Sequence, residues 1–72
     1  MEIFPGISMD AGIRFGKPCL TGTRIDVATI LGELASGASA QEIESEYQLC
    51  REQITVALRY AAHVIAHTPP AR

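Results

Sequence analysis

Apolar residues recur at three- and four-residue steps through the last two thirds of the chain, which is the spacing of helices that bury one face. The pattern predicts three helices. The first begins after Asp26, whose side chain can cap it, and ends at Gly37. The second follows the capping box at residues 39–42 and runs to about Tyr47, and the third covers about residues 51–66.

The first third of the chain has a different pattern, in which glycine and proline separate very short apolar runs. Such a pattern is typical of short strands joined by turns. The runs are Ile3-Phe4, Ile13 to Phe15 and Cys19-Leu20. Gly22 lies where this region turns into the first helix, so we expect it to adopt a positive φ and to tolerate no side chain. Thr23 and Arg24 should then be structural, with the arginine held by a carboxylate or by backbone carbonyls.

Together these patterns predict a mainly α single domain over residues 1–72. Residues 1–24 form an arm of short strands and turns, and residues 26–67 form a tri-helical helix-turn-helix. Two apolar positions anchor its second helix, one fills the turn and two anchor its third helix. These positions are Ile43, Tyr47, Leu49, Ile54 and Ala57. Glu44 and Gln48 stand where such motifs usually have a small residue and a glycine. A three-helix fold tolerates these two departures more easily than a close approach to DNA would.

The third helix carries two semi-apolar faces. The main stripe, which we expect to face the core, consists of Ile54, Ala57, Leu58, Ala61 and Ile65. A second stripe lies on a different face and predicts an interface with a second copy or another partner. Its members are Val56, Tyr60, His63, Val64 and His67, of which the first four are the candidate contact residues.

The composition also favours a partner. The chain has 72 residues, 47% of them hydrophobic and only 19% charged, and a chain this short buries only about 60% of its unfolded surface. A homodimer that uses the Val56, Tyr60 and Val64 stripe, the N-terminal strands or both would cover the excess apolar area. The sequence contains no run of 18 apolar residues and no signal-like N-terminus, so we expect a cytoplasmic protein that does not contact a membrane. Its two cysteines are expected to be reduced and buried.

The net charge of −2 is unevenly distributed, and this bears on DNA binding. A third helix lying in a major groove would present four side chains to bases and phosphates. These side chains are Arg51, Gln53, Thr55 and Arg59. The same half of the motif contains Glu42, Glu44, Glu46 and Glu52. We therefore expect DNA contact only in a dimer or a partner-bound assembly that supplies positive charge.

The sequence predicts no catalytic site, metal or cofactor, and hence no enzyme. His63 and His67 have the spacing of a metal-binding pair, but no third ligand follows nearby. Nothing places a histidine beside a serine, threonine or cysteine nucleophile. The segment Gly16-Lys17-Pro18 lacks the spacing of a phosphate loop, and Pro18 removes an amide that a phosphate would need.

The block from Gly16 to Ile25, Gly-Lys-Pro-Cys-Leu-Thr-Gly-Thr-Arg-Ile, closely resembles the bacterial family called domain of unknown function 433. The segments that follow, including Ala57 to Ala62, extend the resemblance over nearly the whole chain. It implies a homeodomain-like helical fold and a role as the antitoxin of a type II toxin-antitoxin pair. The implied partners are a PIN-like ribonuclease toxin and operator DNA.

This chain departs from the family pattern at two helix starts. The family usually has proline where Asp26 stands, and threonine or serine where Cys50 stands. The chain also lacks the long disordered tail with which many antitoxins wrap their toxins, so partner binding is expected to involve residues 1–24. Two hypotheses remain: an antitoxin that binds DNA and a toxin, or a protein-interaction module whose helix-turn-helix is only a scaffold.

Overall fold

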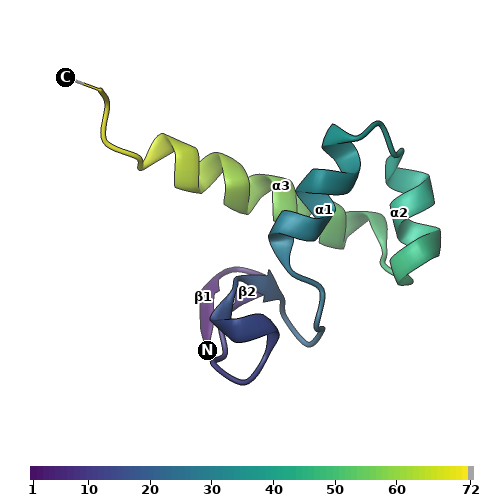
Figure 1. The fold of residues 1–72 in the computed structure, drawn as a ribbon, viewed down its shortest axis with the longest axis horizontal. Coiled ribbons are helices and arrows are strands. Elements are labelled where there is room, and N and C mark those ends of the chain that lie inside the picture. The colour runs from purple at the N-terminus through teal and green to yellow at the C-terminus, as the bar shows by residue number, and fades with distance from the viewer. Residues whose placement is uncertain (72) are drawn as a thin grey trace.

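The computed structural model describes residues 1–71, which form three helices with a small sheet packed on one side (Figure 1). The elements are, in order, β1 (Glu2–Phe4), β2 (Ile7–Ser8), the 3-10 helix η1 (Arg14–Gly16), β3 (Cys19–Leu20), α1 (Val27–Ala35), α2 (Ala40–Tyr47) and α3 (Arg51–Ala66). The chain is therefore mainly α with short N-terminal strands, as the sequence pattern predicts.

The first two helices begin at their predicted caps. Asp26 Oδ1 accepts a hydrogen bond from the backbone N of Thr29 at 2.8 Å, which caps α1. At α2, Ser39 Oγ accepts from the N of Glu42 at 3.1 Å, and Glu42 Oε1 accepts from the N of Ser39 at 2.8 Å. The predicted capping box is therefore confirmed, and it pairs amides that have no partner within the helix. The backbone hydrogen bond from Ser39 also lowers the pKa of Glu42.

Gly37 ends α1 as predicted. Its φ is 99°, in the left-handed region that glycine adopts without steric cost. The N–H of Gly37 donates to the carbonyl of Leu34 at 3.1 Å, and the N–H of Ala38 donates to the carbonyl of Glu33 at 3.0 Å. These two bonds form a Schellman motif, which satisfies the last free carbonyls of the helix and turns the chain toward α2.

The sheet is antiparallel with strand order β1-β2-β3, and it differs from the prediction in one strand. A strand is expected at residues 13–15, and this expectation is wrong. Arg14 and Phe15 have φ values of 49° and 59°, which no extended strand can contain, and they belong to η1. The central strand is instead β2, at Ile7–Ser8, where Ile7 pairs with Leu20 of β3.

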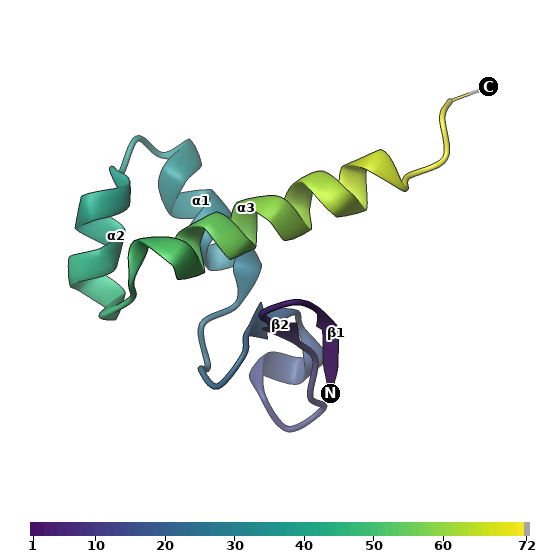
Figure 2. The same ribbon diagram turned by 180° about the vertical axis from the view of Figure 1, so that it is seen from behind.

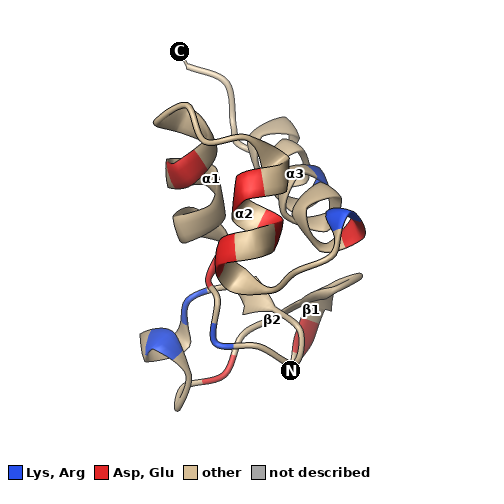
Figure 3. Cartoon of the chain, turned by 90° about the vertical axis from the view of Figure 1, so that its right-hand side faces the viewer, with Lys and Arg blue, Asp and Glu red and all other residues tan. Residues whose placement is uncertain are grey.

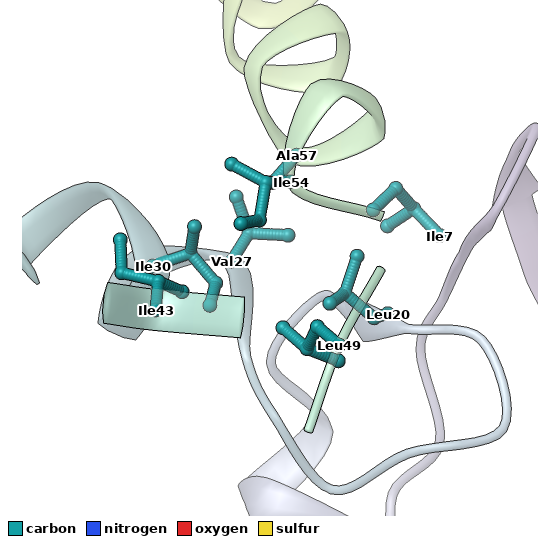
Figure 4. Packing of buried hydrophobic residues seen from close by; sticks show 8 residues of the cluster. All are labelled: Ile7, Leu20, Val27, Ile30, Ile43, Leu49, Ile54 and Ala57. Carbon is teal, nitrogen blue, oxygen red and sulfur yellow. The ribbon is translucent and has the colours of Figure 1, made fainter. Parts of the chain in front are cut away.

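A single hydrophobic core joins the sheet to all three helices (Figure 4). Ile7 and Leu20 of the sheet pack against residues from α1 to α3. The buried cluster consists of Ile7, Leu20, Val27, Ile30, Ile43, Leu49, Ile54 and Ala57. Four of the five positions of the predicted helix-turn-helix pattern are therefore buried, and the fifth, Tyr47, packs against the cluster. The arm is thus part of the same folded core as the helices.

The C-terminal half of α3 projects past the other helices (Figures 1 and 2). α3 has 16 residues and α1 has 9, so α3 is about 10 Å longer at its usual rise per residue. The expected core stripe is confirmed at Ile54 and Ala57, which are buried, and Ala61 is half-buried. It is wrong at Leu58, which is 47% exposed, and at Ile65, which is 73% exposed. Leu58 therefore lies on a face of α3 that the core does not cover, and Ile65 lies in the projecting half of the helix.

Candidate functional site

The turn between α2 and α3 is the first feature of the candidate DNA-binding surface. Gln48 takes the left-handed conformation, with φ 56°, at the position where a helix-turn-helix usually has glycine. Leu49 fills the turn and is buried. At the start of α3, the N of Cys50 donates to Gln53 Oε1 at 2.8 Å. Gln53, a predicted DNA contact, therefore uses its side-chain oxygen to cap its own helix.

The other three predicted DNA contacts are also engaged within the chain. Arg51 Nε donates to Glu44 Oε2, which links α3 to α2. Arg59 Nη1 donates to Glu52 Oε1 at 3.0 Å. Thr55 Oγ1 donates to the carbonyl of Arg51 at 3.2 Å. All four side chains lie within the first nine residues of α3, and both arginines there form an ion pair with a glutamate.

These ion pairs decide the electrostatic character of the surface. The side chains of Arg51 and Arg59 are 63% and 61% exposed, so each pair contributes only about 0–1 kcal/mol to stability. A phosphate would nevertheless have to compete with a carboxylate for each guanidinium. Figure 3 shows acidic positions over α1 and α2 and basic positions divided between the arm and α3. Within residues 1–71 a single chain therefore presents no continuous positive face to DNA.

The chain's own arm covers much of the predicted interface stripe. The ring of Phe4 packs edge-on against Tyr60, with ring centroids 5.5 Å apart, and lies 5.1 Å from the ring of His63. Val56 is half-buried against Gly6, where an added Cβ would lie 2.7 Å from Val56 Cγ1. Val56 and Tyr60 thus bind the arm within one chain, which limits the surface that they offer to another molecule.

An apolar groove lies between α1 and the C-terminal half of α3, and its volume is about 480 Å³. Its lining includes Ala28 and Leu31 of α1, Ala61, Val64 and Ile65 of α3, and Pro18 at one end. Val64, the fourth predicted interface residue, is 43% exposed here. Exposed apolar concavities of this size are where proteins bind apolar ligands or the side chains of partner proteins. We call this site the α1/α3 groove.

The α1/α3 groove continues into a long uncharged segment. Residues 60–71 contain no Asp, Glu, Lys or Arg, although almost all of them are exposed. Apolar side chains in this segment can be covered by a partner without removing a charge from water, and the desolvation of an unpaired charge is costly. The segment therefore combines an apolar surface with a low cost of covering it.

A buried carboxylate ties the arm to the helices beside this groove. Asp26 is only 3% exposed, and its Oδ2 accepts from Arg14 Nε at 3.3 Å. The hydrogen bond from Thr29 lowers the pKa of Asp26, burial opposes this shift, and Arg14 adds to it. Next to Arg14, Phe15 has a positive φ and is 92% exposed. The ion pair thus anchors a turn that holds an aromatic ring in solvent, two residues before Lys17 at the edge of the groove.

The Gly22-Thr23-Arg24 segment has a partly different role from the one expected. Gly22 has φ 81°, so its conformation is the predicted one, but an added Cβ would meet no atom within 4 Å. A side chain therefore has space at Gly22, but the positive φ strains any residue other than glycine there, which is the expected reason for the intolerance. Thr23 is structural, since its Oγ1 donates to the carbonyl of Leu20 at 2.8 Å. Arg24 forms no ion pair or side-chain hydrogen bond with residues 1–71, and within the arm it is Arg14 that a carboxylate holds.

The remaining reactive groups are dispersed. The rings of His63 and His67 lie 4.1 Å apart, and within residues 1–71 no three His, Cys, Asp or Glu residues gather as metal ligands. Both cysteines are free. Cys19 is buried, which raises the pKa of its thiol, but Cys50 is exposed at a helix start, contrary to expectation. The described part of the chain also contains no helix long and apolar enough to cross a membrane.

Sequence reasoning did not find the α1/α3 groove, because its two walls come from segments about thirty residues apart. The uncharged segment 60–71 was the available signal, since an exposed helix usually carries charge on its outer face. The Arg14–Asp26 pair was also missed. Its partners are 12 residues apart, and nothing in their spacing indicates contact.

Comparison with known proteins identifies one relationship. A family model described as "Protein of unknown function (DUF433)" matches residues 7–61. The matched segment runs from β2 into α3 and includes the buried cluster, the turn between α2 and α3, and part of both groove walls. Neither the curated proteins nor the solved structures gave a match.

Proposed function

The chain belongs to the DUF433 family, and we propose that it binds a partner protein as the antitoxin of a type II toxin-antitoxin pair. The proposed partner is a PIN-like ribonuclease toxin, as the sequence resemblance implies. The observation that carries the proposal is the α1/α3 groove, an apolar concavity of about 480 Å³ on a chain of 72 residues. A binding protein needs such a surface, and it needs no catalytic group of its own.

The groove is suited to the apolar side chains of a partner. Covering Val64 and Ile65 would remove apolar area from water, which stabilises a complex by about 25 cal/mol for each Å² covered. The charged groups at the groove are Lys17 and Asp26. Asp26 is already paired with Arg14, so a partner can cover it without stranding a buried charge.

Ala28 gives the sharpest test of the groove. It lies in α1, lines the groove and is exposed, so Ala28→Glu places a charge in the groove without disturbing the core. The matched control is Ala35→Glu, at the other end of the same helix and outside the groove lining. The partner to test is an inactive form of a PIN-like ribonuclease encoded beside this gene. We expect Ala28→Glu to weaken binding by about a hundredfold or more, because an unpaired charge would be desolvated, and Ala35→Glu to bind as the wild type does.

The same variants can be tested for toxin neutralisation. Co-expression of the active ribonuclease with the wild-type chain or with Ala35→Glu should permit growth, whereas co-expression with Ala28→Glu should not. Neutralisation by Ala28→Glu at wild-type level would contradict the proposed site. Absence of any binding to the ribonuclease would favour the alternative function, a protein-interaction module with a different partner.

DNA binding is a second candidate function, favoured by the arrangement of α2, the turn and α3. Because Arg51 and Arg59 are paired with glutamates, we propose DNA contact only for a dimer or a toxin complex. A dimer that neutralises about four phosphates should bind with a logarithmic salt slope near −4, and Arg59→Ala should flatten this slope by about two units. Glu52→Gln should raise the affinity, since it frees Arg59. Anisotropy titrations on the DNA upstream of the gene would measure both effects, and binding indifferent to both variants would exclude this surface.

A further inference from the structure

One exposed apolar stripe of α3 belongs neither to the core nor to the surface that the arm covers. Leu58, Ala62 and Ile65 follow one another at four- and three-residue steps, so they lie on one face of the helix. Leu58 is 47% exposed, Ile65 is 73% exposed, and Ala62 is also exposed. The arm contacts a different face, through Tyr60 and His63. Of the three residues only Ile65, at the edge, also lines the α1/α3 groove.

We propose that this stripe is the interface between two copies of the chain, with their α3 helices antiparallel about a two-fold axis beside Ala62. The proposal goes beyond the proposed function, which concerns the α1/α3 groove and a different protein. A two-fold interface requires a surface that is complementary to itself.

The sizes of the three side chains fit an antiparallel pair. With the axis beside Ala62, the small alanine of each copy meets its counterpart, so the two helices can approach closely. Leu58 lies four residues before Ala62 and Ile65 lies three residues after it. Leu58 of each copy therefore meets Ile65 of the other, and two large apolar side chains pack on either side of a small centre.

The charges of α3 also favour this orientation over a parallel one. All the charged residues of the helix lie within its first nine positions, at Arg51, Glu52 and Arg59, and residues 60–71 carry none. In an antiparallel pair centred on Ala62, the two helices overlap over residues 58–66. Arg59 then lies beside the uncharged Ile65 of the other copy, and Arg51 and Glu52 lie beyond the end of its α3. No like charges then face each other. In a parallel pair Arg59 would lie beside Arg59, and Glu52 beside Glu52.

This interface replaces most of the stripe expected from the sequence. Val56 and Tyr60 were candidates for the contact between copies, but Gly6 and Phe4 of the same chain pack against them. Leu58, Ala62 and Ile65 lie on a face of α3 that the arm leaves exposed. The homodimer expected from composition is thus assigned to a different set of residues.

Sedimentation equilibrium tests the interface with the wild-type chain and three variants, each of which replaces one alanine with glutamate. Ala62→Glu places two glutamates at the axis and should raise the dissociation constant of the dimer by about a hundredfold or more. Ala35→Glu and Ala28→Glu make the same substitution outside the stripe and should leave the dimer intact. Even a weak dimer forms at a concentration of about 100 µM. A wild-type chain that is monomeric at this concentration would overturn the proposal, and so would a dimer that survives Ala62→Glu. Dissociation by Ala28→Glu alone would place the second copy in the α1/α3 groove and would also overturn it.

Disulfide trapping tests the orientation. In a Cys50→Ser background, which removes the exposed thiol, Ala62→Cys should cross-link to itself under mild oxidation. A mixture of Leu58→Cys and Ile65→Cys chains should form mainly the mixed disulfide, as expected for antiparallel helices. Cross-linking of Leu58→Cys mainly to itself would indicate a parallel pair and contradict the proposal. Toxin binding by Ala62→Glu is a separate readout, since loss of the dimer leaves the groove of each chain present.

Discussion

Replacing Gly6 with alanine tests how tightly the arm is packed on α3. Gly6 lies between β1 and β2 with φ 87°, and its carbonyl accepts a hydrogen bond from the N of Thr21 at 2.9 Å. An added Cβ would lie 2.7 Å from Cγ1 and 3.4 Å from Cγ2 of Val56, on α3. Two separate penalties therefore apply to Gly6→Ala, one from the backbone conformation and one from the collision.

Gly22 serves as the reference that separates the backbone penalty from the collision penalty. A left-handed alanine costs about 1–2 kcal/mol relative to its preferred conformations. Overpacking a core position costs about 1–3 kcal/mol, and Val56 is half-buried, so its side chain can shift and the lower end applies. Gly6→Ala should therefore lower the free energy of unfolding by about 2–4 kcal/mol. Gly22 has nearly the same φ, 81°, but open space around it, so Gly22→Ala should cost only the first amount.

Urea denaturation followed by circular dichroism gives both values, and a double variant isolates the collision. In a Val56→Ala background both Cγ atoms are gone, so the additional cost of Gly6→Ala should fall to about that of Gly22→Ala. The reasoning fails if Gly6→Ala costs no more than Gly22→Ala. It also fails if the effects of Gly6→Ala and Val56→Ala are simply additive.

Three further substitutions test other contacts by the same denaturation assay. Asp26→Ala removes the cap of α1 and the partner of Arg14, so it should cost about 2 kcal/mol at pH 7. Because the pKa of Asp26 is lowered from 3.8 in the folded state, its contribution is present above that pH and is lost as the pH falls through the folded pKa. The difference from the wild type should therefore shrink at acid pH, and a constant difference would contradict the ionised cap. Phe15→Gly should raise stability by about 0.5–1 kcal/mol, because the ring is 92% exposed and φ is 59°, and a loss of stability would mean that the ring packs in solution. Tyr47→Phe removes the hydrogen bond to Glu33 at 2.8 Å and should cost about 1 kcal/mol, and an unchanged midpoint would show that the bond does not form. That hydrogen bond also raises the pKa of Tyr47 to about 12, so ionisation of its phenol should require that pH.

The helices were predictable because their ends are determined locally. Asp26 and the Ser39–Glu42 capping box each pair an amide within three or four residues, and Gly37 supplies the left-handed conformation at the end of α1. Local signals of this kind can be read from the sequence without knowledge of the fold. The helix-turn-helix spacing was predictable for the same reason, since a period of 3.6 residues reports which side chains share a face.

The strands and the candidate surfaces depend on contacts between distant segments. β2 has only two residues and therefore no periodicity, and its place in the sheet is set by its pairing with β3. The exposure of Leu58 and Ile65 depends on where the other elements pack against α3, which a helical wheel of α3 does not contain. In the same way, Arg51 is less available to a phosphate because it forms an ion pair with Glu44, on the other side of the turn. The candidate surfaces therefore depend on how the helices and strands are arranged in space.

The measurement that tests the partner-binding proposal most directly is an amide NMR titration of the labelled chain with the inactive PIN-like ribonuclease. Binding in the α1/α3 groove should shift or broaden the signals of Ala28, Leu31 and Val64, with much smaller changes in α2. Perturbations confined to α2 and the first half of α3, or none at saturating ribonuclease, would contradict the proposed function.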